Sequence, residues 1–268
     1  MTSWMKDIPD GRFLSDINLP GTHNSCARYV AFPHFSKCQN LTVSDQLKMG
    51  IRLLDIRVEK KKDKLICVHS VVNCRKSFFG KAIALENVIG DCREFLESNP
   101  TETVVISFKK DDGRESDREV FDLFLKKYAD NLWYMNPDVP QLGQVRGKLV
   151  LLNRCVDSHG LNFTGWKTAE PEKEIAAYSN GNFRYVIQDE FQTSPERKWK
   201  SFVKPMLDAR FGDETVLNFI SANDSVHSPK FFAKLMNKNL SLYNFEKDKK
   251  YGWLFFDYPD INIIEKFI

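Results

Sequence analysis

Hydrophobic runs of strand length recur throughout the 268-residue chain. Most of them are nearly continuous in Val, Ile, Leu and Phe, which is typical of strands that are buried on both faces of a parallel sheet. We predict eight strands from these runs, at residues 17–22, 52–58, 65–70, 103–108, 148–154, 185–189, 216–221 and 253–258.

Amphipathic helical patterns separate several of these strands. Residues 82–100 carry apolar side chains at intervals of three and four, and Pro100 marks the end of the pattern. Residues 115–133 repeat it, with acidic residues first and basic residues last, as the helix dipole favours. Residues 194–211 and 228–245 both begin with Ser-Pro, an N-cap followed by a proline in the first turn. The alternation predicts an α/β fold, a single (β/α)8 TIM barrel that spans residues 1–268.

One connection does not fit a regular barrel. Only residues 59–64 join the second and third predicted strands, and this segment is too short for the crossover helix that parallel strands require. We therefore expect a distorted barrel, or a hairpin inserted at this edge of the sheet.

Composition and charge narrow the classes of function. The 39 basic and 36 acidic residues leave a net charge of +3, which is too small to indicate a nucleic-acid partner. No apolar run approaches 18 residues, and the N-terminus lacks the hydrophobic region of a signal peptide. We expect a monomer, either secreted or membrane-peripheral as a mature chain, or cytoplasmic.

The six cysteines include no Cys-x-x-Cys pair and are expected to be reduced structural thiols.

Polar residues gather where the predicted strands end. In a barrel of parallel strands these ends meet at one face, where active sites are built. A single charge at a strand end marks only the point where the strand reaches solvent, but most of the eight strands follow this rule. The residues are His23, Asp55, Arg57, His69, Lys109, Arg154, Asp189, Asn223 and Asp257.

The types of residue in this set indicate a chemistry. Two histidines suit a general base and a general acid, because the imidazole pKa lies near working pH. Arg57, Lys109 and Arg154 suit an anionic substrate, and a guanidinium holds phosphate oxygens in a two-point fork. Aspartates beside such cations bind sugar-like hydroxyls or orient a histidine. A phosphodiester that carries a polyol fits these groups.

Several motifs together resemble a known family. "INLPGTHNS" (17–25), "GIRLLDIR" (50–57), "VHS" (68–70), "VVISFKK" (104–110), "VIQDEF" (186–191) and "FFDYP" (255–259) occur in its order. On these motifs the chain resembles the X domain of phosphatidylinositol-specific phospholipase C, in its single-domain bacterial form. The resemblance implies cleavage of phosphatidylinositol, with glycosylphosphatidylinositol anchors as a second substrate class, to diacylglycerol and inositol 1,2-cyclic phosphate. It implies no cofactor and no metal.

The resemblance also implies catalytic roles. His23 matches the general base that activates the inositol 2-hydroxyl, and His69 matches the general acid that protonates the departing diacylglycerol oxygen. Arg57 matches the arginine that neutralises the phosphate in metal-independent members. Calcium-dependent members carry acidic residues there, so this guanidinium argues against a metal. Asp257 matches the carboxylate that orients the base, and Asp55 is expected to support Arg57 or His69.

Substrate-binding residues follow from the same resemblance, with two departures. Lys109, Arg154 and Asp189 match residues that hold the inositol hydroxyls. Asn24 stands where bacterial members often have Asp, and an amide cannot share in acid catalysis. Phe191 stands where a tyrosine often stacks on the inositol ring, so the ring face is kept and a hydroxyl is lost.

Other interpretations stay open at this point. A metal-dependent phosphodiesterase of the glycerophosphodiesterase or sphingomyelinase D-like type also uses two histidines, but Arg57 and the lack of a Glu-x-Asp at that strand end count against it. A degenerate inositol-lipid binding module is a third possibility. Aromatic residues concentrate in two predicted loops, 31–35 and 77–80. Burial is the default expectation for them, and insertion into a lipid surface, where the enzyme meets phosphatidylinositol, is the alternative.

Overall fold

The computed structural model describes residues 2–111, 113–166, 175–224 and 226–268. Its strands are β1 (Leu19–Thr22), β2 (Leu53–Lys61), β3 (Lys64–His69), β4 (Val72–Asn73), β5 (Val104–Lys110), β6 (Trp133–Tyr134), β7 (Leu149–Asn153), β8 (Leu161–Asn162), β9 (Ala176–Ser179), β10 (Arg184–Gln188), β11 (Thr215–Phe219) and β12 (Trp253–Phe256). Its α-helices are α1 (Pro33–Ser36), α2 (Val43–Met49), α3 (Leu85–Ser98), α4 (Asp117–Lys127), α5 (Leu142–Val145), α6 (Pro195–Arg197), α7 (Lys204–Asp208), α8 (Pro229–Leu242) and α9 (Ile261–Phe267).

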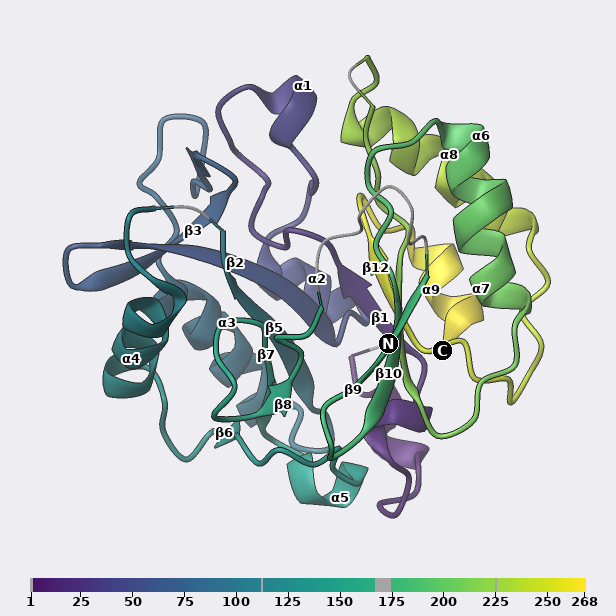
Figure 1. Ribbon diagram of the computed structural model, residues 1–268, viewed down its shortest axis with the longest axis horizontal. Coiled ribbons are helices and arrows are strands. Elements are labelled where there is room, and N and C mark those ends of the chain that lie inside the picture. Colours follow the sequence, from purple (N-terminus) through teal and green to yellow (C-terminus); the bar gives the residue numbers. More distant parts are fainter. Residues whose placement is uncertain (1, 112, 167–174, 225) are drawn as a thin grey trace.

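The strands form one curled, largely parallel sheet (Figure 1). Neighbouring strands follow the order β6-β7-β5-β2-β1-β12-β11-β10-β9, and β8 pairs with β7. The first strand, β1, therefore lies beside the last, β12, with Leu19 opposite Trp253. Among the described residues the pairing does not join the two ends of this path, so the barrel is distorted.

The predicted strand 65–70 is not a parallel strand of the sheet, and this part of the eight-strand prediction is wrong. It is β3, which pairs antiparallel with β2 as a hairpin, the alternative that the short connection had left open. Strand β2 continues to Lys61, and the chain reverses at Lys62, whose φ is 57°. Cys67 lies opposite Val58, so β3 returns toward the sheet as it approaches His69.

The helix predictions are confirmed at three of the four segments by α3, α4 and α8. Ser228 is the N-cap of α8, as its Ser-Pro sequence predicts, because its side chain accepts a hydrogen bond from the Phe231 amide. Residues 194–211 instead form α6, a π-helical turn at Lys198–Val203, and α7. Pro205 has no amide hydrogen and interrupts the regular ladder at this point.

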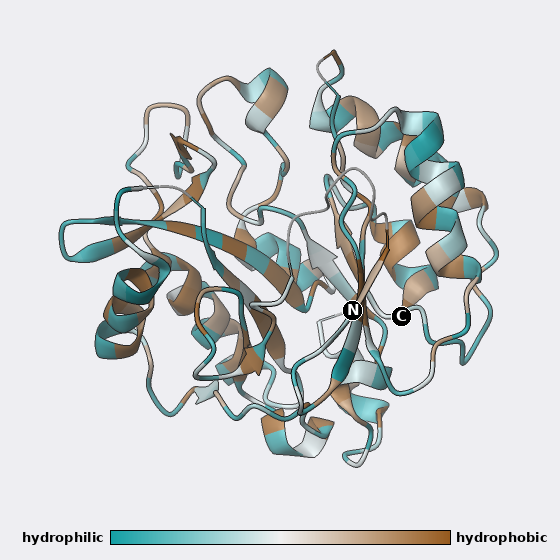
Figure 2. Cartoon of the chain, in the orientation of Figure 1, coloured by the Kyte–Doolittle hydropathy of each residue, from teal (hydrophilic) through white to brown (hydrophobic). Residues whose placement is uncertain are grey.

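Alternation of side chains along each strand separates two cores. Leu54, Ile56 and their neighbours on the other strands pack outward against the helices. Leu53 and Phe255, which point the opposite way, belong to the core inside the curled sheet. Figure 2 shows apolar colours along the central strands and mixed colours on the surrounding helices. Because the side-chain period of a strand is two, residues that continue the inward series emerge together at the carboxyl end of the sheet.

All six cysteines are free, buried thiols, as predicted. Within the described ranges, no helix combines the length and the apolar character needed to cross a membrane.

Candidate active site

The inward series of several strands ends in a predicted site residue. Asp55 and Arg57 follow Leu53 on β2, and Asp257 follows Phe255 after β12. The same spacing places a polar residue at the carboxyl end of β5 and directly after β1, β7 and β10. The resulting cavity has a volume of about 230 Å³. Nine predicted site residues line it: His23, Arg57, His69, Lys109, Arg154, Asp189, Phe191, Asn223 and Asp257.

The other two predicted residues lie beneath the cavity. Asp55 is 1% exposed and Asn24 is 2% exposed, so neither presents a free surface to a ligand. The three remaining histidines do not line the cavity: His34 and His159 are exposed, and His227 pairs with Asp224 at 2.8 Å.

His23 is oriented by two polar contacts. Its Nδ1 lies 2.9 Å from Oδ1 of Asp257, a carboxylate that is almost fully buried. Its Nε2 lies 3.2 Å from the side-chain amide of Asn24. With the ring proton on Nδ1 directed at the carboxylate, Nε2 is left as an acceptor. Burial raises the pKa of Asp257 above its ordinary value, although the proximity of His23 acts in the opposite direction.

His69 lies across the cavity from His23. The centres of the two rings are 5.9 Å apart, and the rings are nearly perpendicular at 85°. Nδ1 of His69 is 2.8 Å from the carbonyl oxygen of Ser36, which only accepts, so this nitrogen carries a proton and Nε2 is the variable position. Burial, together with the charges of His23 and Arg57, lowers the pKa of His69 to about 4.

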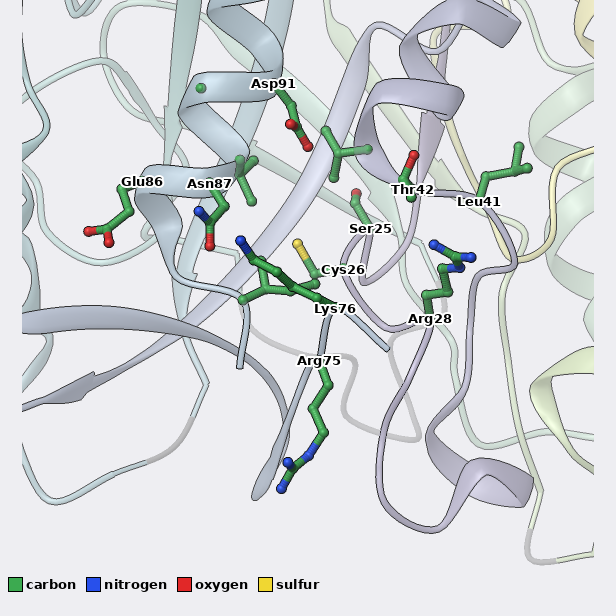
Figure 3. A pocket seen from close by; sticks show the side chains of 14 residues that line it. Ser25, Cys26, Arg28, Leu41, Thr42, Arg75, Lys76, Glu86, Asn87 and Asp91 are labelled. Carbon is green, nitrogen blue, oxygen red and sulfur yellow. The ribbon is translucent and has the colours of Figure 1, made fainter. Parts of the chain in front are cut away.

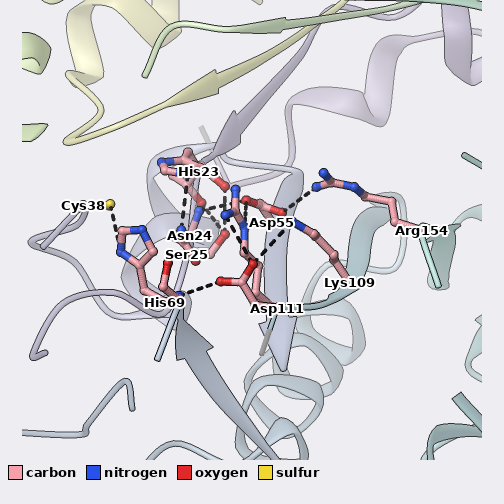
Figure 4. A network of polar contacts seen from close by, with 12 residues as sticks. His23, Asn24, Ser25, Cys38, Asp55, His69, Lys109, Asp111 and Arg154 are labelled. Carbon is pink, nitrogen blue, oxygen red and sulfur yellow. Dashed lines mark hydrogen bonds and ion pairs between the residues drawn. The ribbon is translucent and has the colours of Figure 1, made fainter. Parts of the chain in front are cut away.

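Arg57 is held between the carboxylates of Asp55 and Asp111. Figure 4 labels these two carboxylates together with the two imidazoles. The Nε of Arg57 donates to Oδ2 of Asp55 at 3.0 Å, and its Nη1 lies 3.7 Å from Oδ1 of Asp111. Burial lowers the pKa of Arg57, but the two carboxylates outweigh it and raise the value. Arg57 and Arg154 likewise overcome the effect of burial and hold the pKa of Asp55 well below its usual range.

Both histidines precede a residue with left-handed backbone geometry. Asn24 has φ 44° and Ser70 has φ 49°, a conformation that is uncommon for residues other than glycine. The Asn24 amide donates to Asp55 at 3.1 Å, and the Ser70 amide donates to Asp111 at 2.6 Å. The carboxylates that flank Arg57 therefore also fix the two turns that carry the imidazoles.

The cationic side of the cavity is formed by Lys109 and Arg154. Lys109 Nζ lies 3.3 Å from Asp111, and burial together with the charges of Arg154 and Arg57 lowers the pKa of Lys109. Arg154 Nη1 is 3.4 Å from Asp55, and its guanidinium stacks 3.4 Å above the centre of the Trp166 ring. Such a stacked, paired arginine presents a fixed positive charge.

Sequence reasoning missed three contributors to this site. Asp111 binds both Arg57 and Lys109. Phe219 packs edge-on against His23 at 6.0 Å and stacks on Phe255 at 4.1 Å, which supports the imidazole from the core inside the sheet. Cys38 places its sulfur 3.8 Å from Nδ1 of His69.

A second cavity, of about 430 Å³, lies between α2, α3, the loop after β1 and the segment after β4 (Figure 3). Its walls mix the cations Arg28, Arg75 and Lys76 with Glu86 and Asp91. No histidine lines it, so it does not offer the paired acid and base of the first cavity.

The aromatic loops are exposed, and the default expectation that they are buried is wrong. Phe32 is 72% exposed, Phe78 is 72% exposed and Phe79 is 92% exposed. Phe35, on α1, is 55% exposed and also lines the active-site cavity. Trp166, by contrast, is buried under Arg154.

Comparison with known proteins places this geometry in a family. The model for the X domain of phosphatidylinositol-specific phospholipase C matches residues 22–155. The chain belongs to this family. Its resemblance to relatives is not confined to that segment, because 96% of the chain aligns at 26% identity with 88% of a 1-phosphatidylinositol phosphodiesterase from Staphylococcus aureus. A 1-phosphatidylinositol phosphodiesterase from Listeria monocytogenes is also 26% identical, over 99% of this chain and 83% of its own length.

A solved structure of the S. aureus phosphatidylinositol-specific phospholipase C, from work on the modulation of its membrane binding, has a TM-score of 0.80 at 25% identity. It covers 99% of this chain and 97% of the other. The predicted single-barrel fold is thereby confirmed as the fold of bacterial phosphatidylinositol-specific phospholipase C, with β3 in the hairpin instead of the barrel.

Proposed function

We propose that this chain is a phosphatidylinositol diacylglycerol-lyase that forms inositol 1,2-cyclic phosphate without a metal ion. One observation carries the proposal: two imidazoles, 5.9 Å apart, border a single cavity together with the guanidinium of Arg57. Each imidazole is fixed by a different partner on its Nδ1, so both direct Nε2 toward bound substrate. The proposal treats residues 1–268 as one catalytic domain.

His23 acts as the general base. Its Nε2 accepts the proton of the inositol 2-hydroxyl, and that oxygen attacks the neighbouring phosphorus. The nearby carboxylate of Asp257 stabilises the imidazolium that forms. Because nucleophile and phosphorus belong to one molecule, proximity supplies much of the acceleration and the protein supplies proton transfer and charge.

His69 acts as the general acid and must first gain a proton. Its low pKa in the free protein comes from burial and from the cations around it. A phosphodiester anion beside the ring opposes those charges and favours the imidazolium. The protonated Nε2 then delivers its proton to the departing diacylglycerol oxygen.

Arg57 stabilises the charge that develops on the phosphate oxygens. It is almost enclosed between Asp55 and Asp111 and has little freedom to move. A preorganised donor of this kind is worth about 100- to 1,000-fold in rate. The guanidinium of Arg57 beside the phosphate supplies the positive charge that a divalent ion would otherwise provide.

Lys109, Arg154 and Asp189 hold the inositol hydroxyls, and Phe191 covers one face of the ring. All four line the cavity that holds the two imidazoles. Because Phe191 has no hydroxyl, it contributes apolar contact without a hydrogen bond.

The exposed aromatics support peripheral contact with a membrane that contains the lipid substrate. Phe32, Phe78 and Phe79 are large apolar side chains in solvent, and Phe35 connects α1 to the cavity. Insertion of these rings at the lipid interface would bring the cavity to the headgroup. The protein acts in this proposal as a monomer on phosphatidylinositol, with glycosylated anchors as further substrates.

Phosphorus NMR on phosphatidylinositol vesicles with excess chelator tests the proposal. Inositol 1,2-cyclic phosphate should appear first, at an undiminished rate. A metal-dependent phosphodiesterase of the glycerophosphodiesterase or sphingomyelinase D-like type would lose its activity under these conditions. An inactive lipid-binding module would bind the vesicles and release no cyclic phosphate.

A further inference from the structure

Cys38 is a buried thiol in the wall of the active-site cavity. The backbone ties it to the end of β12, because the amide of Tyr258 donates to the Cys38 carbonyl at 3.0 Å and the Tyr258 hydroxyl donates to Lys37 at 2.7 Å. Tyr258 directly follows Asp257, so these two bonds hold the thiol beside the carboxylate that orients His23.

Three side chains of different chemistry converge at this point. Ligand atoms of His23, Cys38 and Asp257 all lie within 4.8 Å of one another. They come from the end of β1, the loop after α1 and the end of β12. Ligands of a tetrahedral zinc ion lie about 3.3–3.8 Å apart, given bond lengths of about 2.0–2.3 Å. Small side-chain movements are enough to bring these three atoms to those separations.

The donor set favours one class of ion. A thiolate, an imidazole and a carboxylate are the ligands of Zn²⁺ and similar thiophilic ions, whereas Mg²⁺ and Ca²⁺ prefer oxygen ligands alone. Binding releases the thiol proton to solvent and shifts the ring proton of His23 from Nδ1 to Nε2, so one proton leaves for each ion bound. A water or phosphate oxygen completes the coordination from the open cavity.

We propose that His23, Cys38 and Asp257 form an inhibitory site for Zn²⁺ or another thiophilic divalent ion. The inhibitory effect rests on the proposed function, because the ion would occupy Nδ1 of the general base and its carboxylate partner. A chelator therefore restores activity here, the opposite of its effect on a metal-dependent phosphodiesterase.

Cobalt spectroscopy reports the site without reference to catalysis. Co²⁺ added to the metal-free protein should produce a near-ultraviolet charge-transfer band from the thiolate, at one ion per chain, and Zn²⁺ should remove it. Cys38→Ser should lack the band. The matched control Cys92→Ser alters a buried thiol of α3 outside the cavity and should keep it. Thermal unfolding verifies that each variant is folded, and Cys38→Ala replaces Cys38→Ser if the latter is not.

Zinc titration of phosphatidylinositol cleavage completes the test, with each variant compared to its own metal-free rate. The zinc concentration for half-inhibition should rise by at least about 10-fold in Cys38→Ser and stay unchanged in Cys92→Ser. Absence of the cobalt band, its persistence in Cys38→Ser, or equal zinc sensitivity of the two variants would overturn the site. A protein that binds Co²⁺ through Cys38 but cleaves no lipid would instead refute the proposed function.

Discussion

Replacement of Asp257 by Asn tests how the general base is prepared. In the structure the carboxylate lies 2.9 Å from Nδ1 of His23 and is only 3% exposed. An amide of the same shape removes the negative charge. Its NH₂ group also donates to Nδ1, which moves the ring proton to Nε2 and blocks the position that must accept the hydroxyl proton.

The electrostatic part of the effect can be estimated from the distance. At 2.9 Å and an effective dielectric constant of about 20, the imidazolium and carboxylate attract each other by about 6 kcal/mol. At 1.36 kcal/mol for each factor of ten, this corresponds to at most about 10⁴-fold in rate. We expect kcat for phosphatidylinositol cleavage to fall by about 100- to 10,000-fold in Asp257→Asn.

The stability of the Asp257→Asn variant, unlike its kcat, should not fall. Because burial raises the pKa of Asp257 in the folded protein, the ionised carboxylate carries a net cost to folding at any pH above that titration. The neutral amide removes this cost, so the melting temperature should be unchanged or higher.

The assay is kcat on lipid vesicles together with calorimetric unfolding. Asp224→Asn is the matched control, because Asp224 also pairs with a histidine, His227, at a distance of 2.8 Å, and neither residue lines the cavity. The kcat of this variant should stay near the wild-type value. Turnover of Asp257→Asn within a few-fold of wild type would refute the role of this carboxylate.

Three further predictions concern charge. Arg57→Lys keeps the positive charge but loses the two-point hydrogen bonding of the guanidinium, so kcat/KM measured with chelator present should fall by about 100- to 1,000-fold. An unchanged kcat/KM would contradict the role of the guanidinium. NMR titration of the His69 ring should give a midpoint of about 4 in the free protein, and inorganic phosphate should raise it; a midpoint at the ordinary value of about 6.5 without phosphate would count against the environment described. Burial lowers the pKa of Lys198 to about 7, against about 10.4 in the unfolded chain, so the unfolded state binds more protons between these values and the free energy of unfolding should rise with pH across that window. Lys198→Met should flatten this rise in denaturant titrations, and an unaltered slope would show that the ammonium is not its source.

The barrel could be predicted because its strands carry a strong local signal. Buried parallel strands are nearly continuous apolar runs, and seven of the eight predicted runs became parallel strands of the sheet. The eighth became β3, since pattern alone does not distinguish a hairpin strand from a barrel strand. Short helices such as α2 and α9 were not predicted, because seven residues give too few turns for a clear helical period.

Much of the site could be predicted for the same reason. Residues that continue the inward-facing series of a strand come together at the site, and the missed Asp111, which follows Lys109 by two positions and pairs with it, continues the series of β5. Cys38 gave no such signal. It lies in an irregular loop, and tertiary hydrogen bonds, among them those with Ala27 and Tyr258, bring its sulfur to the histidines. Phe219 could not be distinguished from an ordinary core residue, because the apolar pattern of its strand is the same with or without a contact to His23.

The most direct test of the assignment of base and acid compares two leaving groups. Phosphatidylinositol expels an alkoxide that needs a proton, whereas an aryl ester of inositol phosphate expels a phenolate that does not. His69→Ala should lose about 100- to 10,000-fold on the lipid and little on the aryl ester, while His23→Ala should lose a similar large factor on both. If His69→Ala is impaired equally on the two substrates, His69 is not the general acid and the paired-imidazole account is wrong.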